Sequence, residues 1–555
     1  MADMPNNLKN SVPNDDSPIK RKVTRVDPGL QIPLFFETQE PAEPVPVALA
    51  DNVKFFDNGD QNKLIVLKEH LKSSSLGDVF IIDALLNNQD WSDFESAYKP
   101  GGRSPYAPKA MVAIILYGLM HGVSSLRKLE RMARDSLGCL WLSGGIMPDH
   151  SVIGRFIDHH ADILTLEFFE SLTLTVLRRT HSTVSYTAGD GTVIEAAASR
   201  YKTIRREALK KQIDKTQQKL EEIKVNEEID RNEIAKTNAH LERLLKAEQC
   251  LSEREAKTKI KGRDPKRVQI NPQELDAVNQ PLKQQGYGVS YKPGVIVNDK
   301  RVIVGIGVDA SSEPLVGVDL LAQAARFGEL TESSWDAGYS CKQMLEQEAQ
   351  HAVSLLIPEG SSHKKDWSKS CEKQYPKSRF EYDTSTDTYR CPAGLLLKAV
   401  NTCKGTRPYT QYKTKSCQSC EQREKCTKSK QGRSIKRYES DHLREAMREK
   451  LKDESVRERY RKRSGWVEPI FSHLKEQQGL TRFRRKGLRK VRVEFALHAL
   501  AYNLGRAIAL CRAENACERA INRLRVVVLA IKRNICVIAL KTIDLTQADR
   551  NAKFA

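Results

Sequence analysis

The spacing of apolar and polar positions divides the chain into helical and strand-like stretches. Residues 1–50 hold eight of the 22 prolines and little periodic apolar pattern, which predicts a disordered segment. From 51 to 180 the apolar spacing is helical, and the apolar run at 110–120 predicts a buried helix. Beyond 180 the pattern changes to the alternation that is typical of strands.

Two short helices are predicted toward the end of the helical region. Ser124 or Ser125 can cap the first, and Asp149 or Ser151 can cap the second after a glycine break. Paired helices of this kind can read a DNA groove when they expose basic residues. An ordinary helical domain with a solvated basic face explains the pattern equally well, and the residues concerned are Arg127, Lys128, Arg131, Arg134 and Arg155.

Strand patterns surround a long polar segment with helical spacing. Residues 182–199 indicate a strand, a turn at Asp190–Gly191 and a second strand or helix start. Residues 204–256, within an insertion predicted at 201–280, are dense in Lys, Glu and Gln, and their apolar residues recur at helical spacing. This pattern therefore predicts a helical-hairpin insertion that bends near 226–232.

The second run of strands leads into alternating helix and strand. Residues 286–310 predict two strands joined by a turn at Asn298–Asp299–Lys300. A helix is predicted over 314–330, and residues 353–360 predict another buried strand. This order predicts an α/β fold built on a mixed sheet.

Three acidic residues are candidates for chemistry at this sheet. Asp190 follows a strand-like run, Asp336 precedes a predicted helix, and Glu468 lies in a predicted helix with four apolar residues turned inward. Carboxylates are preferred ligands of Mg²⁺, and two such ions can assist phosphodiester chemistry. Taken one by one, these acids are explained as readily by a turn, a helix cap and a surface position. The inward residues are Val467, Ile470, Phe471 and Leu474.

Length and charge narrow the class of protein. The 555 residues are too many for one core, and the net charge of +20 favours a polyanionic partner such as DNA. A generally basic soluble protein is the alternative. We find no apolar run long enough to span a membrane and no apolar signal core at residues 1–10, so a cytoplasmic protein is expected. In that compartment the 12 cysteines favour metal binding over disulfides.

A cysteine cluster interrupts the stretch between Asp336 and Glu468, within an insertion predicted at 366–440. A CxxC step binds one metal ion readily, and four thiolates complete a tetrahedral zinc site. The predicted ligands of this structural Zn²⁺ are Cys391, Cys417, Cys420 and Cys426, with Cys371 or Cys403 as a replacement for one of them.

A basic strip at residues 481–492 follows Glu468 closely and has seven basic residues among twelve, with no acid. A charge run of this kind is often only a solvated face. Its position after the candidate metal site favours contacts with DNA phosphates. The predicted DNA contacts are Arg482, Arg484, Arg485, Lys486 and Arg489, together with Lys475 ahead of the strip.

The sequence around the acids resembles bacterial insertion-sequence transposases of the DDE type. TAGDGTVIEAAASR (187–200) is similar to their first-aspartate block and SSWDAGYS (333–340) to the second. The segment 466–506 resembles the third block, in which a glutamate opens a helix before a basic strip. Upstream, 102–130 resembles the N-terminal domain of this group, within the insertion-sequence 4-like superfamily and its 1182 branch.

The resemblance implies an RNase H-like catalytic core at 181–510, interrupted by the two insertions, and a helical DNA-binding domain at 51–180. A helical tail at 511–555 would follow. Asp190, Asp336 and Glu468 are then implied as ligands of Mg²⁺ or Mn²⁺, two ions in all. The reaction implied is cleavage of insertion-sequence ends and strand transfer into target DNA, performed near the nucleoid by at least a homodimer that binds the terminal inverted repeats.

Related elements carry a Tyr, Arg, Glu, Lys signature around the glutamate. Tyr460, Arg463, Glu468 and Lys475 match its order, with one residue more between Arg463 and Glu468 than the strict pattern has. The seven-residue step from Glu468 to Lys475 would place both on one face of an α-helix. The competing hypothesis is a catalytically inactive or domesticated transposase that only binds DNA, and a structure-specific nuclease lies between the two.

Overall fold

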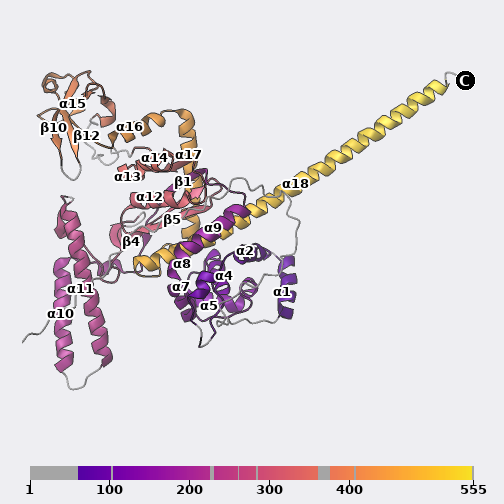
Figure 1. Ribbon diagram of the computed structural model, residues 1–555, viewed down its shortest axis with the longest axis horizontal. Helices are drawn as coiled ribbons and strands as arrows, with labels where there is room; N and C mark the ends of the chain where they lie inside the picture. The colour runs from indigo at the N-terminus through magenta and orange to yellow at the C-terminus, as the bar shows by residue number, and fades with distance from the viewer. Residues whose placement is uncertain are drawn as a thin grey trace, which may run out of the picture. The chain divides into compact units, whose positions relative to one another are not determined.

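The computed structural model describes residues 61–74, 76–99, 101, 104–225, 231–260, 262–282, 286–359, 375–404 and 408–552. For 526–552 it describes only the course of the helix. The predicted disorder of 1–50, part of the predicted bend at 226–232 and residues 366–374 of the predicted cysteine insertion lie outside the described residues. Figure 1 shows the elements in chain order.

The described residues from Gln61 to Arg179 form a helical region, as the apolar spacing predicts. The predicted helix at 110–120 is confirmed as α4, in which eleven residues are buried. Asp149 caps α7 by accepting hydrogen bonds from the amides of Ser151 and Val152. The helices are α1 (Gln61–Ser73), α2 (Asp78–Asn87), α3 (Ser92–Ser96), α4 (Pro108–Met120), α5 (Leu126–Asp135), α6 (Leu137–Ser143), α7 (His150–His159), α8 (Ala161–Thr165) and α9 (Glu167–Arg179).

The sequence pattern did not predict α6, which lies between the two short basic helices. Ser136 caps it by accepting a hydrogen bond from the amide of Cys139, and Gly144 ends it in the left-handed conformation. The helix is only seven residues long, so its apolar period is too short to recognise in the sequence. The segments α5 and α7 therefore pack together across another helix, not across a simple turn.

A mixed sheet follows the helical region. The strands are β1 (Tyr186–Gly191), β2 (Ile194–Glu195), β3 (Val278–Pro281), β4 (Tyr287–Asn298), β5 (Ile303–Asp309), β6 (Glu332–Trp335) and β7 (Ser354–Leu356). The second half of β4 pairs antiparallel with β5 on one side and with β1 on the other. Next to β1, the strands β6 and β7 run parallel to it. The order β5-β4-β1-β6-β7 confirms the predicted α/β class.

Two predicted elements are shorter than the sequence pattern suggested. The helix predicted at 314–330 is α12 (Glu313–Ala324), because the chain turns before Gly328, whose φ is +153°. The strand predicted at 353–360 is β7, because Pro358 follows it and has no amide hydrogen for the ladder. The predicted turn at Asn298–Lys300 does join β4 to β5.

Two groups of elements lie between parts of the main sheet in the sequence. The helices α10 (Arg206–Val225) and α11 (Arg231–Ile260) pack together between β2 and β3 around their own apolar cluster. After β7, a separate antiparallel sheet has its strands in chain order and its own cluster of aromatic residues. Its elements are β8 (Glu381–Asp383), β9 (Thr388–Arg390), β10 (Leu396–Cys403), β11 (Tyr409–Lys413), α15 (Arg423–Cys426) and β12 (Ser434–Tyr438).

The last helices close the main core. After α16 (Asp441–Lys450), α17 (Glu454–Ser472) packs on β1, β4 and β6 and continues into a π-helical turn, η7 (His473–Gln477). The final helix, α18 (Leu488–Ala552), packs through its first half on α4, α8, α9 and β5. One apolar cluster therefore runs from the N-terminal helices through α18 to the sheet.

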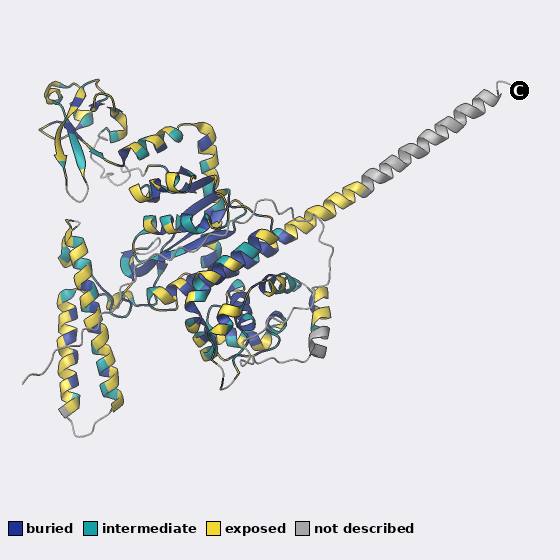
Figure 2. Ribbon diagram, in the orientation of Figure 1, coloured by how far each residue is buried: buried dark blue, intermediate teal, exposed yellow. Residues whose placement is uncertain are grey.

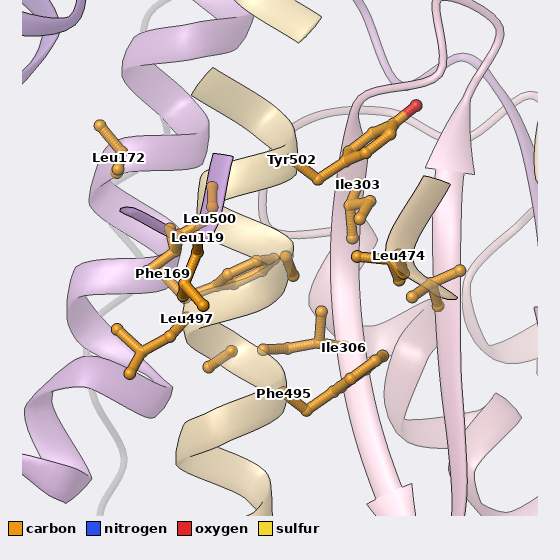
Figure 3. Packing of buried hydrophobic residues seen from close by; sticks show 14 of the residues in the cluster. Leu119, Phe169, Leu172, Ile303, Ile306, Leu474, Phe495, Leu497, Leu500 and Tyr502 are labelled. Carbon is orange, nitrogen blue, oxygen red and sulfur yellow. The ribbon is translucent and has the colours of Figure 1, made fainter. Parts of the chain in front are cut away.

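Figure 3 shows how α18 joins these parts. Leu497 and Leu500 point toward the N-terminal helices, where Phe169 lies, while Phe495 points toward Ile306 of β5. All five side chains are buried. Burial of a Leu or Phe side chain contributes about 1.5–3 kcal/mol, so this half of α18 is a major source of stability.

Candidate active site

The parallel pairing of β1 with β6 brings two of the three candidate acids together. Gly189 is the partner of Trp335 in this register, so Asp190 and Asp336 are the next residues of two neighbouring strands. Burial raises the pKa of Asp190, and the nearby carboxylate of Asp336 raises it further. Two like charges held side by side in this way favour a cation between or beside them.

Trp335 and Gly189 fit each other behind the two carboxylates. The Trp335 side chain is fully buried, and a Cβ atom on Gly189 would lie 2.1 Å from its ring. The glycine thus leaves the space that the large ring fills, and the indole nitrogen donates a hydrogen bond to Ser333 over 2.8 Å. This contact explains why a bulky residue can stand directly before Asp336.

Both aspartates also make local hydrogen bonds of the kind that turns and caps require. Asp190 accepts a hydrogen bond from the amide of Gly191, and Asp336 accepts one from the amide of Gly338, each over 2.8 Å. Asp336 caps the short 3₁₀ helix η3 (Ala337–Tyr339). These bonds hold each carboxylate through one oxygen and fix its orientation at the end of its strand.

Helix α17 places a cation against this pair. The Nη1 atom of Arg463 lies 3.3 Å from Oδ2 of Asp190, and both side chains are largely buried, with 13% and 21% exposed. The guanidinium lowers the pKa of Asp190 and so opposes the effect of burial. Tyr460, one turn earlier, is close enough to Arg463 for its own pKa to be lowered by it, although burial raises the pKa of Tyr460 more strongly.

Arg463 and Tyr460 thus lie at the two aspartates, whereas in the sequence analysis they were only matches to a family signature. The signal was their order before Glu468. The extra residue between Arg463 and Glu468 made the match to the signature inexact. The sequence of a helix alone also does not show which of its residues face the sheet. A second anchor fixes that face: Arg459 on α17 forms an ion pair of 2.9 Å with buried Glu332 of β6.

Glu468 lies on the same helix, five residues after Arg463, and its side chain is exposed. Among the described residues its carboxylate has no hydrogen bond or ion pair, and no contact joins it to Asp190 or Asp336. The four apolar neighbours that we expected to turn inward, at 467, 470, 471 and 474, are all buried. Glu468 therefore lies on the exposed side of α17, the helix that Arg459 and Arg463 fix over the two aspartates.

The step from Glu468 to Lys475 does not run along a regular α-helix. Pro469 lacks the amide hydrogen of its turn, and α17 widens into the π-helical turn η7, in which the amide of Gln478 bonds to the carbonyl of His473. Lys475 instead donates a hydrogen bond of 2.6 Å to Thr192, two residues after Asp190. Lys475 therefore lies near Asp190 because of its bond to Thr192, and not because it shares a regular helix face with Glu468.

The oxygen atoms of this site suit a hard divalent cation such as Mg²⁺, because two carboxylates stand together and one is partly desolvated. Within the described ranges, however, no group of three or more His, Cys, Asp or Glu side chains is arranged to hold a metal ion. In this arrangement Arg463 supplies the positive charge beside Asp190. Asp190 and Asp336 are the side chains that would hold the cation.

The basic strip makes contacts within the protein that the sequence did not reveal. Arg485, of which 15% is exposed, forms an ion pair of 2.5 Å with Asp158 of α7, and Arg489 pairs with Asp162 of α8 over 2.7 Å. Arg482 donates to the carbonyl oxygens of residues 196 and 198. These three predicted DNA contacts thus also hold the strip against the rest of the fold.

Two other predicted DNA contacts, Arg484 and Lys486, form no ion pair with another described residue. Arg484 is exposed and donates one hydrogen bond, to Ser124 over 3.0 Å. Lys486 is exposed and has no hydrogen bond or ion pair within the part of the chain that is described. Beneath them, buried Glu494 accepts hydrogen bonds from the amides of Arg484 and Arg485, which shapes the loop. Burial raises the pKa of Glu494, while these amides lower it.

The five basic residues predicted on the short N-terminal helices are all exposed. They lie on α5 and α7, and one of them, Arg134, pairs with Glu130 over 2.6 Å. The carboxylate of Glu130 also accepts a hydrogen bond from the amide of His150 at the start of α7. Both interpretations, a DNA-reading pair of helices and a solvated basic face, remain compatible with this surface.

The four predicted zinc ligands line one small cavity of about 20 Å³ in the separate sheet, although the cysteines come from three different segments. Burial raises the pKa of Cys426, Arg433 lowers it, and the other three thiols raise it. The amide of Leu395 donates to Sγ of Cys391 over 3.3 Å. Cys403 is not among the residues that line the cavity, and Cys371 lies outside the described residues.

Two parts of the chain match known protein families. Residues 68–159 match a family described as "Transposase domain (DUF772)", and residues 390–508 match one described as "Transposase DDE domain". No curated protein sequence matches the chain. The two matches support a transposase of the DDE type, an enzyme acting on DNA, but do not distinguish a branch within that group.

The matched ranges include most of the N-terminal helices, the four clustered cysteines, Glu468 and the basic strip, whereas Asp190 and Asp336 lie outside them. Divalent metal ions are the general expectation for a DDE transposase. In the described part of the chain, no helix has the length and apolar character needed to cross a membrane.

Proposed function

We propose that this protein cleaves DNA at the ends of an insertion sequence and joins the freed ends to target DNA. The observation that carries the proposal is the meeting of Asp190 and Asp336 at the ends of adjacent parallel strands, under a helix that bears Arg463 and Glu468. The strand order of the main sheet supports the RNase H-like core that the sequence resemblance implies.

In this proposal Asp190, Asp336 and Glu468 hold Mg²⁺ or Mn²⁺, two ions in all. When bound, the metal would lower the pKa of the attacking hydroxyl and stabilise the charge on the leaving oxygen. The protein contributes rigid positions: β1 and β6 fix the aspartates, and Arg459 ties α17 to the sheet through Glu332. Arg463 balances the negative charge next to Asp190.

DNA would be held beside this site by the basic residues that follow it. Lys475 lies close to β1 through Thr192, and exposed Arg484 and Lys486 can neutralise phosphates. Arg482, Arg485 and Arg489 orient the strip by their contacts within the protein and add positive potential. The exposed basic face of α5 and α7 would bind the terminal inverted repeats.

The proposal is tested with the full-length protein, a duplex carrying the element's terminal repeats, and Mg²⁺. We expect Asp190→Asn, Asp336→Asn and Glu468→Gln each to reduce cleavage more than about 100-fold, beyond the loss of a group that merely orients a ligand. Binding to the same duplex, measured by mobility shift, should remain. Glu458→Gln is the matched control, because Glu458 is exposed on the same helix.

Equal cleavage by the three variants and the unchanged protein would refute the assignment of these residues. Binding without any nicking by the unchanged protein in Mg²⁺ or Mn²⁺ would favour the alternative, a transposase-derived protein that only binds DNA. Cleavage without joining to a target duplex would instead indicate a nuclease.

We also propose that Cys391, Cys417, Cys420 and Cys426 hold a structural Zn²⁺. Their common cavity supports this, although no three of these thiols are already arranged around one point in the described residues, so they would have to close around the ion. Such an ion would order a small sheet that has few buried side chains of its own. Elemental analysis of the purified protein should give one zinc per chain, and Cys420→Ser should remove it. Cys403→Ser, in the same sheet but away from the cavity, should retain it; loss in both variants or zinc in neither protein would contradict the proposal.

A further inference from the structure

The positive charge beside the two aspartates comes from the inward face of α17. Buried or half-buried positions recur along this helix at steps of three and four residues, while most positions between them are exposed. They include Val456, Tyr460, Arg463 and Val467. Figure 2 shows buried and exposed positions alternating along α17. Arg463 thus extends from the face that packs on the sheet, and not from the solvent side of the helix.

Each carboxylate oxygen of Asp190 already has a partner. Its Oδ1 accepts the hydrogen bond from the amide of Gly191, and its Oδ2 lies 3.3 Å from Nη1 of Arg463. Asp336 accepts the amide of Gly338 through Oδ1, and among the described residues its Oδ2 accepts no hydrogen bond. A cation held by both carboxylates would therefore share Oδ2 of Asp190 with the guanidinium.

A guanidinium and a divalent ion on one oxygen repel each other. Mg²⁺ binds a carboxylate oxygen at about 2 Å, so the two positive charges would stand within about 5 Å of each other in a site that is only partly open to water. Nη1 of Arg463 is buried, and in the described part of the chain it donates no hydrogen bond of good geometry. Charge, and not directional bonding, holds the guanidinium beside Asp190, and the same charge works against a cation at that oxygen.

We propose that Arg463 competes with the divalent ion for Asp190, and that a DNA phosphate beside the site ends the competition by taking up the guanidinium. This inference rests on the proposed function, because it concerns the regulation of the same site. An arginine fork binds a phosphate through paired hydrogen bonds, which replace the contact that it gives up. Metal then binds tightly where DNA is present, and by linkage the metal strengthens DNA binding by the same factor.

Manganese binding to the full-length protein without DNA tests the competition. Electron paramagnetic resonance of free Mn²⁺ measures the affinity, and the binding that Asp190→Asn removes defines the site. Arg463→Gln should bind Mn²⁺ at least about tenfold more tightly than the unchanged protein, as expected if Arg463 leaves the oxygen free for at most about a tenth of the time. An arginine that only positioned Asp190 would give the opposite sign, because its loss would weaken Mn²⁺ binding.

Two variants serve as controls for this measurement. Arg461→Gln removes an arginine of the same helix whose side chain is 63% exposed, and it should leave the Mn²⁺ affinity unchanged because water and salt screen its charge. Arg463→Lys keeps the positive charge, and its affinity should stay close to that of the unchanged protein. Thermal unfolding shows that each variant is folded at the temperature of the measurement.

A duplex that carries the terminal repeats tests the release of Arg463. It should strengthen Mn²⁺ binding to the unchanged protein by a factor within the range of about 5 to 150 that is usual for linked sites. In Arg463→Gln the factor should be smaller, because no guanidinium has to leave Asp190.

Weaker or equal Mn²⁺ binding by Arg463→Gln would overturn the competition, and so would an equal gain in Arg463→Lys. A duplex that has no effect on the unchanged protein, or the same effect on it and on Arg463→Gln, would overturn the release by phosphate. If no Mn²⁺ binding depended on Asp190 in any of these proteins, the proposed metal site itself would be contradicted, and this inference with it.

Discussion

Gly189, the residue before Asp190, has no side chain, and this allows β1 and β6 to bring the two aspartates together. Gly189 faces the ring of Trp335 across the β1–β6 pair, and the ring fills the space above the glycine. The position of Asp336 therefore depends on a residue that is remote in sequence and has no side chain. The sequence shows both residues but gives no sign that they are partners.

We expect Gly189→Ala to destabilise the protein by about 1–3 kcal/mol, the range for overpacking in a core, and to reduce cleavage. Trp335→Leu, added to it, should restore part of the stability by making room for the new methyl group. Gly465→Ala on α17 serves as control: nothing lies within 4 Å of its Cβ position, and it should stabilise the helix by about 0.5–1 kcal/mol. Thermal unfolding measures all four proteins, and an unaffected Gly189→Ala would contradict this account of the contact.

A buried histidine makes stability depend on pH. His498 is 1% exposed on α18, and burial lowers its pKa to about 3, whereas an unfolded histidine titrates near 6.5. Between these values the unfolded chain binds the proton and the folded one does not, so stability is lost as the pH falls. The loss approaches about 1.4 kcal/mol per pH unit.

We predict that His498→Leu makes this dependence less steep between pH 6.5 and pH 4, as measured by denaturant unfolding, while buried His160, whose pKa burial lowers to about 4, keeps its own contribution. His442→Gln, at an exposed position on α16, should leave the slope unchanged. A slope that is the same in the unchanged protein and in His498→Leu would show that His498 takes up its proton without unfolding.

Among the elements, those with strong periodicity were predictable and those fixed by single contacts were not. The apolar runs of α4 and α17 and the β4–β5 turn gave correct elements, because burial and turn chemistry act locally. The short helix α6 was not predicted, since a single cap and a glycine bound it, and the π-helical turn η7 was not predicted, since the sequence shows no change of period where it begins. For the site, the sequence located the two aspartates that meet, but only the fold places Arg463 beside them.

The basic strip combines two roles that a variant pair can separate. Arg485→Ala should destabilise the protein by about 1–2 kcal/mol, because it removes a largely buried guanidinium and leaves half-exposed Asp158 with Lys490 as its remaining ion-pair partner. Lys486→Ala should change stability by less than about 0.5 kcal/mol, since this side chain is exposed. On DNA, Lys486→Ala should reduce the slope of log affinity against log salt concentration by about 1.

Thermal unfolding and binding titrations at several salt concentrations provide both readouts. A salt slope that Lys486→Ala leaves unchanged would exclude a phosphate contact by Lys486. If Arg485→Ala proved as stable as the unchanged protein, the ion pair with Asp158 would have no measurable structural role.

At the scale of the whole molecule, α18 makes the N-terminal helices and the sheet parts of one core. Asn503 is fully buried on this helix, with its amide bonded to both the N–H and the carbonyl of Ile303 in β5, and to Thr173 of α9. The helical and strand patterns suggested separate regions, because no local pattern shows that two regions share one helix. The described part of the main core is therefore expected to unfold cooperatively.

Hydrogen exchange followed by mass spectrometry tests this expectation. The slowest amides of α4 and of β5 should exchange with the same free energy of opening. Asn503→Ala should lower both by about 2–4 kcal/mol, because it leaves two backbone groups of β5 without partners. Asn515→Ala, exposed on the same helix, should lower neither, and a loss confined to β5 would show that the two regions open independently.

The wide turn at η7 amounts to one surplus residue carried inside a helical stretch. If the turn instead closed into ordinary α-helical bonding with every residue retained, everything that follows would swing by about 100° around the axis. Lys475 would leave Thr192, and the loop that presents the cations after it would begin on another side of the molecule. The number of residues between Glu468 and the basic strip at 481–492 therefore helps to determine where the strip can contact a DNA phosphate.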